Sequence, residues 1–95
     1  MAEQAELTLK KGQIVYRQND YEMRFYDILY GAVSLYQNYG TKEQVLIKEL
    51  NSGDYFGEME LIEAMPRTTT AVATERTQVK VYTAEDFGAL KSSAV

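Results

Sequence analysis

The chain has 95 residues, of which 45% are hydrophobic and 25% are charged, and this composition is typical of one folded domain with a modest core. Its net charge of -4 and its lack of a basic cluster exclude a nucleic-acid surface or an anionic membrane as the main partner. Cysteine and histidine are absent, which removes thiol catalysis, disulfides, the usual zinc sites and a histidine general base. We therefore expect a single non-catalytic domain over residues 1–95, with no metal site.

The N-terminal segment, "MAEQAELTLK", lacks the basic-then-apolar order of a secretory signal. No apolar stretch approaches the roughly 20 residues of a membrane span. The sequence thus predicts a cytoplasmic location and no membrane partner.

The first clear strand pattern lies in "YDILYGAVSLY", residues 26–36. Alternation with a period of two predicts strands on either side of Gly31. Before this glycine, the side chains expected on one shared face are Tyr26, Ile28 and Tyr30. After it, Val33 and Leu35 are expected to point inward, whereas Ser34 and Tyr36 are expected to point outward.

Two later segments also predict strands. "QVLIKEL", residues 44–50, is expected to be the more buried, and "TQVKVY", residues 77–82, alternates again. Turn residues recur about every ten positions. They are Gly12, Asn19 and Asp20, Gly31, residues 38–40 and residues 51–54. This rhythm predicts an antiparallel sandwich or barrel.

The end of the chain carries a helix signal. Thr83 is expected to cap this helix, with Asp86 three residues later as in a capping box, and Phe87 and Leu90 would share one face. The helix would last about two turns.

The segment "FGEMELIEAMPRTTTAVA", residues 56–73, carries the chemistry, and we call it the cassette. Gly57 allows close approach of backbone to a ligand, and Pro66 restricts the direction in which Arg67 leaves the loop. Backbone N–H groups at a helix start together with one cation predict an anion site. Glu58, an acceptor, suits hydroxyl groups on the same ligand. A phosphate with a neighbouring hydroxyl indicates a ribose phosphate.

These residues resemble the phosphate-binding cassette of the cyclic nucleotide-binding domain family. "KKGQIVYRQND", "MRFYDILYGAVSLY" and "LNSGDYFGE" look like the successive strands and turns of that family's β-roll. The resemblance implies a mainly β, antiparallel, jelly-roll-like β-roll with a short cassette helix and a truncated C-terminal helix. It also implies that Glu58 binds the ribose 2′-hydroxyl and that Arg67 binds the cyclic phosphate. The expected nucleotide-binding residues are Gly57, Glu58, Met59, Arg67, Thr68 and Thr69.

The sequence departs from the family pattern at four places. Glu60 stands where a small residue is common and adds a negative charge near the expected phosphate. Thr69 replaces a frequent alanine, and "RQND" lacks a usual glycine, although Asn19 or Asp20 tolerates positive φ. The family's longer C-terminal helix, which closes the pocket over the base, is not seen before Val95.

The resemblance implies a non-catalytic regulatory module that binds cAMP before cGMP and needs no other cofactor. The expected partners are the cyclic nucleotide and either a second copy of the chain or an attached effector domain. The alternative is a degenerate fold that serves as an interaction or oligomerisation scaffold without binding nucleotide.

For Arg67, the alternative role is an ion pair with Glu58, Glu60 or Glu63. If it binds phosphate instead, we expect Arg67→Ala to cost the unliganded fold little. Thr70 is expected to lie in a plain strand. A glycosidase-like carboxylate pair, Glu58 with Glu60, is disfavoured because loose acidic pairs are common.

Overall fold

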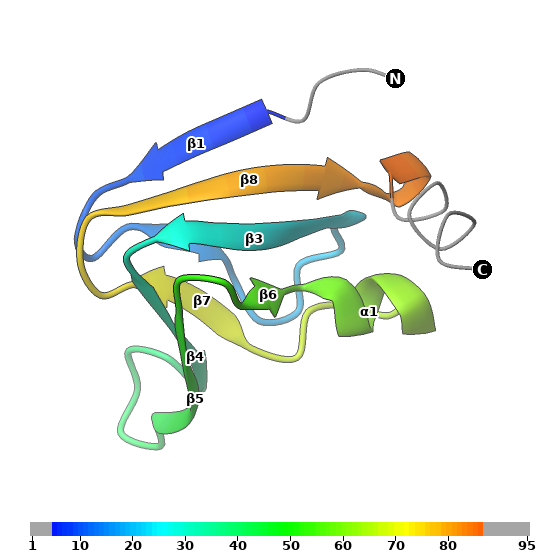
Figure 1. Cartoon of the computed structure of the whole chain (residues 1–95). Coiled ribbons are helices and arrows are strands. Elements are labelled where there is room, and N and C mark those ends of the chain that lie inside the picture. The colour runs from blue at the N-terminus through cyan, green and yellow to red at the C-terminus, as the bar shows by residue number, and fades with distance from the viewer. Residues whose placement is uncertain (1–4, 87–95) are drawn as a thin grey trace.

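The computed structural model describes residues 5–86, which form two antiparallel four-stranded sheets, one short helix and a helical turn at residues 84–86 (Figure 1). The first sheet has the order β1 (Ala5–Leu9), β8 (Thr77–Thr83), β3 (Arg24–Tyr30) and β6 (Tyr55–Phe56). The second has the order β2 (Ile14–Tyr16), β7 (Thr70–Ala73), β4 (Ala32–Gln37) and β5 (Val45–Asn51). Helix α1 (Glu58–Glu63) follows β6 directly. This architecture confirms the predicted antiparallel β-roll with a short cassette helix.

The core is built from inward-facing side chains of both sheets. Its buried members are Leu9, Tyr16, Tyr26, Ile28, Val33, Leu50, Phe56, Ala71, Ala73, Val79 and Val81. The rings of Tyr26 and Phe56 stack with their centroids 4.9 Å apart. Because neighbouring strands contribute alternate side chains to this cluster, each sheet buries one face against the other.

The predicted alternation between residues 26 and 36 is confirmed in its centre and wrong at two positions. Tyr26, Ile28 and Val33 are buried as expected. Tyr30 is 44% exposed, because a register shift between Ile28 and Tyr30 takes the end of β3 out of the alternation. Ser34 is buried, because β4 lies between β7 and β5 and a small side chain fits against these neighbours.

Strand β5 exists as predicted, but the expectation that it is a buried strand is wrong. It is an edge strand that pairs with β4 alone among the described strands, and Val45, Leu46 and Ile47 are each about half exposed. Only Leu50 reaches the core cluster from this strand. An edge position leaves one flank and the outer face open, so an apolar run there stays at the surface.

The predicted turns and the predicted capping box are present. Asn19 adopts φ 77°, which confirms that this turn needs no glycine. The Asp86 backbone N–H donates to Thr83 Oγ1 at 3.2 Å, and the Thr83 N–H donates to Asp86 Oδ2 at 2.9 Å. Phe87, Leu90 and the remainder of the predicted C-terminal helix lie outside the described residues. In the span from residue 5 to residue 86, no helix has the length and apolarity to cross a membrane.

Candidate functional site

Helix α1 starts and ends at residues with left-handed backbone. Gly57 precedes it with φ 87°, and Ala64 follows it with φ 52° and bonds back to the helix carbonyls. A Cβ atom at position 57 would lie 2.8 Å from Arg67 Nη1 and 3.3 Å from the Arg24 carbonyl oxygen. Gly57 is therefore required by the guanidinium packed beneath it. The sequence had suggested close approach of a ligand as the reason for this glycine.

Arg67 is buried, with 1% of its surface exposed, and its guanidinium contacts four acceptors. Nη1 donates to the Gly57 carbonyl at 2.7 Å and to Glu60 Oε1 at 3.1 Å. Nη2 donates to the Arg24 carbonyl at 2.6 Å and to Glu22 Oε1 at 3.1 Å. The guanidinium thus links the loop between α1 and β7 to α1 itself and to β3.

Further contacts fix the position of Arg67. The Tyr16 ring lies under the guanidinium, with the Cζ atom 4.1 Å from the ring centroid. The Arg67 backbone N–H donates to the Asp20 carbonyl at 2.7 Å, and its carbonyl accepts from the Asn19 N–H at 2.8 Å. Burial raises the pKa of Tyr16 well above its usual range, so the phenol under the cation stays neutral.

This arrangement corrects the expectation that Arg67→Ala would cost the unliganded fold little. An exposed ion pair contributes about 0–1 kcal/mol, whereas breaking a buried one costs about 3–5 kcal/mol because it strands a desolvated charge. Of the three predicted ion-pair partners, Glu60 is the one that pairs with Arg67. Glu22 is a second partner that the sequence did not indicate. Glu22 lies just before β3 and outside the alternating pattern, so the sequence did not indicate which way its side chain points.

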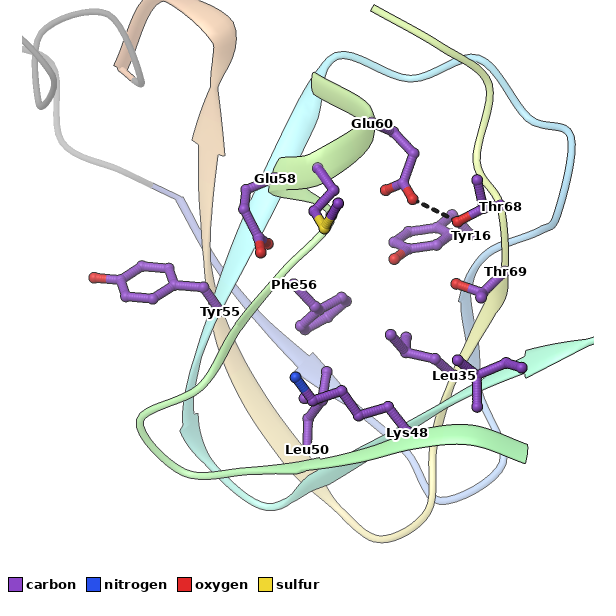
Figure 2. Close-up of a pocket in the computed structure, with 13 residues that line it drawn as sticks. Tyr16, Leu35, Lys48, Leu50, Tyr55, Phe56, Glu58, Glu60, Thr68 and Thr69 are labelled. Atoms are coloured by element: carbon purple, nitrogen blue, oxygen red, sulfur yellow. Dashed lines mark hydrogen bonds between the residues drawn. The ribbon is translucent and has the colours of Figure 1, made fainter. Parts of the chain in front are cut away.

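Glu60 is also buried, with 8% of its surface exposed. Its Oε1 accepts from Arg67, and its Oε2 accepts from the Thr68 hydroxyl at 2.7 Å (Figure 2). The carboxylate therefore bridges the cation and the hydroxyl that the cassette pattern assigns to the phosphate.

A cavity of about 220 Å³ lies between α1 and β5. Figure 2 shows Glu58 and Glu60 on the α1 side of this cavity and Lys48 and Leu50 on the opposite wall. Five of the six predicted binding residues line it: Gly57, Glu58, Met59, Thr68 and Thr69. Arg67, the sixth, is not among the residues that line this cavity, and its guanidinium is buried in contacts with the protein.

Two buried side-chain atoms have no hydrogen-bond partner among residues 5–86: Glu58 Oε2 and Arg67 Nε. An unsatisfied buried polar atom costs about 1–3 kcal/mol and calls for an explanation. Both atoms belong to side chains predicted to bind the ligand. The described residues contain no group of three or more acidic side chains arranged to hold a metal ion.

The fold is a β-roll whose cassette runs from β6 through α1 to β7 beside this cavity. The sequence model of the cyclic nucleotide-binding domain matches residues 6–93. The chain belongs to this family.

The chain is similar to several proteins that carry this domain. It is 30% identical over 80 residues to the cyclic AMP receptor protein of Thermus thermophilus, covering 84% of this chain and 37% of that protein. It is 34% identical over 77 residues to the cAMP-dependent protein kinase regulatory subunit of Dictyostelium discoideum, covering 81% of this chain and 23% of that protein.

Among solved structures, an EAL enzyme in cAMP-bound and cGMP-bound forms matches with a TM-score of 0.80 and 28% identity. That match covers 86% of this chain and 22% of the solved chain. The chain thus spans well under half of the length of each of these proteins.

Proposed function

We propose that the domain binds a cyclic nucleotide, cAMP before cGMP, and acts as a non-catalytic regulatory module. The observation that carries this proposal is the buried, unsatisfied acceptor Glu58 Oε2, which belongs to a side chain that lines the cavity. A carboxylate accepts hydrogen bonds only, so a ligand hydroxyl supplies the donor that this atom lacks. A ribose 2′-hydroxyl is such a donor.

The preference for cAMP rests on the relatives. One is a cyclic AMP receptor protein and another is a cAMP-dependent kinase regulatory subunit. Because this domain fills only part of each, the regulated output would belong to another segment or partner. The absence of cysteine and histidine from the chain supports a binding role, because common nucleophiles and general bases are missing.

Calorimetry with cAMP and 2′-deoxy-cAMP tests the role of Glu58. Hydrogen bonds to a charged group contribute about 1.5–3 kcal/mol, so Glu58→Ala should weaken cAMP binding by about ten- to hundredfold. Wild type should lose a similar factor with the deoxy ligand. Glu58→Ala should show no further loss with it, since the partner is already gone.

Glu63→Ala is the matched control for that experiment. It removes an exposed carboxylate from the other end of α1 and should bind cAMP like wild type. Equal affinity of wild type and Glu58→Ala for cAMP would refute the assigned contact.

Base selectivity should be weak. Thr68 carries a hydroxyl at the cavity wall that can reach a phosphate oxygen or a guanine amino group, so it does not strongly favour one base. We expect cAMP and cGMP affinities within tenfold, or about 1.4 kcal/mol. Competition between the two nucleotides checks this, and a hundredfold preference would show that another group reads the base.

A second candidate function is an interaction scaffold that no longer binds nucleotide. The observation in its favour is Glu60, whose carboxylate is already bonded to Arg67 and to the Thr68 hydroxyl, the two groups expected to contact the phosphate. The two functions differ in calorimetry: a scaffold gives no heat of binding with millimolar cAMP or cGMP.

A further inference from the structure

We infer that Glu60 is a built-in competitor for the ligand phosphate. The anion seat, defined as Arg67 Nη1 together with the Thr68 hydroxyl, is occupied by the Glu60 carboxylate. A phosphate reaches this seat only after that carboxylate leaves. This inference deepens the proposed function and rests on it for the identity of the phosphate as that of a cyclic nucleotide.

The contact geometry supports competition for the same donors. One carboxylate oxygen of Glu60 lies 3.1 Å from Arg67 Nη1, and the other lies 2.7 Å from Thr68 Oγ1. Two oxygens of a phosphate group would accept from the same two donors in the same way. Since each of these short contacts uses its donor hydrogen, Glu60 and a phosphate compete for the same seat.

The local charge also opposes simultaneous occupation. Arg67 is already paired with two carboxylates, Glu60 and Glu22, and the side chain of Glu58 lines the same cavity. A phosphate added beside these carboxylates would be one more anion near a single guanidinium. The anions would repel one another strongly, because the site is partly shielded from water. The exchange of Glu60 for phosphate keeps the number of anions at Arg67 unchanged. Displacement is therefore favoured over addition.

The seat would survive the departure of Glu60. Nη1 keeps its bond to the Gly57 carbonyl, and Nη2 keeps its bonds to the Arg24 carbonyl and Glu22. The guanidinium is thus held in place by contacts that do not involve Glu60. Thr68 is exposed, so the carboxylate has a route towards solvent next to its own partner.

The cost to affinity follows from the population of the open seat. Minor conformations of proteins are commonly populated at about 0.1–10%. The apparent association constant equals the intrinsic one multiplied by the open fraction, because only the open form binds. Removing the competing carboxylate should therefore raise the affinity for cAMP by about tenfold or more.

The test uses Glu60→Ala, which empties the seat, and Glu60→Gln, which keeps the side-chain shape but removes the charge. Glu63→Ala, on the exposed end of the same helix, is the control for loss of one negative charge. Circular dichroism and thermal melting show whether each variant folds. Calorimetry then measures cAMP, and nuclear magnetic resonance of the Arg67 side chain follows inorganic phosphate.

We expect Glu60→Ala to bind cAMP at least about tenfold more tightly than wild type, with Glu60→Gln intermediate and Glu63→Ala unchanged. Equal cAMP affinity in wild type and both Glu60 variants would overturn the competitor role and leave the proposed function intact. If no protein binds cAMP but the Glu60 variants gain a phosphate-dependent change in the Arg67 resonances, the competitor role stands and the proposed function fails.

Two further outcomes would also overturn the inference. The first is that the Glu60 variants respond to neither cAMP nor phosphate, which would show that the seat does not bind anions. The second is that both Glu60 variants unfold under conditions in which Glu63→Ala stays folded. Glu60 would then be a structural partner of Arg67 that no ligand can displace.

Discussion

The two cassette side chains that are predicted to bind the ligand, Glu58 and Arg67, differ in how far the protein itself satisfies their hydrogen bonds. At the start of α1, Glu58 lines the cavity with an acceptor atom that has no partner within the described chain. In the loop between α1 and β7, Arg67 is buried and bonded to four acceptors. Glu58 therefore keeps one acceptor without a partner, whereas the two Nη groups of Arg67 are already bonded to the protein and only its Nε is unpaired within residues 5–86. A binding motif therefore specifies which groups are present, but not whether they are free.

The largest expected effect concerns Arg67. Arg67→Ala should lower the free energy of unfolding by about 3–5 kcal/mol, because it leaves the buried Glu60 carboxylate without its ion-pair partner and removes the Arg67 donors from two carbonyls. For a domain of this size, that is a fall in melting temperature of more than about 12 °C. Urea denaturation measures it, and Arg76→Ala, at an exposed position, is the control. Equal stability of both variants would show that the Arg67 network contributes nothing.

The second prediction asks whether the packing of Arg67 depends on having a glycine at position 57. Gly57→Ala and Gly40→Ala place the same methyl group on left-handed backbone, with φ 87° and 81°. A Cβ at position 40 meets nothing within 4 Å, whereas one at position 57 meets the Arg67 guanidinium. We expect Gly57→Ala to be less stable than Gly40→Ala by about 1–3 kcal/mol in urea unfolding. Equal losses would mean that backbone strain alone explains both.

The third prediction uses pH to probe the ring beneath Arg67. Burial raises the pKa of Tyr16 above the ordinary value of 10.0, so the folded state holds this proton more tightly than the unfolded state. The resulting contribution to stability is complete below pH 10 and is lost as the pH rises from there through the folded pKa. A folded pKa that lies one pH unit above the unfolded pKa corresponds to about 1.4 kcal/mol of stability.

Tyr16→Phe should therefore flatten the loss of stability above pH 10, as followed by urea unfolding at several alkaline pH values. Tyr30→Phe, which alters a 44% exposed ring, is the control. An unchanged slope in Tyr16→Phe would show that another group causes the alkaline loss.

The smallest effect is expected at Glu58. Glu58→Ala removes an unsatisfied buried acceptor and also a favourable acidic group at the start of a helix, and these two effects oppose each other. The unliganded stability should therefore change by less than about 1 kcal/mol. Thermal melting without nucleotide checks this. A loss as large as that of Arg67→Ala would show that both regions are structural.

The sequence predicted the strands best where one face is buried and the other is not. Residues 77–81 of β8 alternate in the sequence and in the structure, whereas Tyr82 is buried in a second cluster with Phe25 and Leu61. The prediction failed for β5, since an apolar run does not reveal whether a strand is inside a sheet or at its edge. Edge position depends on strand order, which is a property of the whole fold.

The cassette residues were recognisable from the sequence, but the state of Arg67 was not. Glu60 stood out as an added charge and was one of three potential partners of the arginine. The sequence could not distinguish among them, because only the left-handed turn at Gly57 and the placement of α1 bring Glu60 to Arg67. Glu22 was not found, because it is 45 positions away in the chain and meets Arg67 only through the pairing of the sheets.

The carboxylate at position 60 also bears on how such a domain changes over generations. A change in the middle base alone converts a glutamate codon into an alanine codon, so a seat closed by Glu60 and an open one are a single point mutation apart. The remaining bonds of Arg67 to Gly57, Arg24 and Glu22 would be inherited unchanged. Under the proposed function, a lineage could thus weaken or strengthen nucleotide binding without rebuilding the fold.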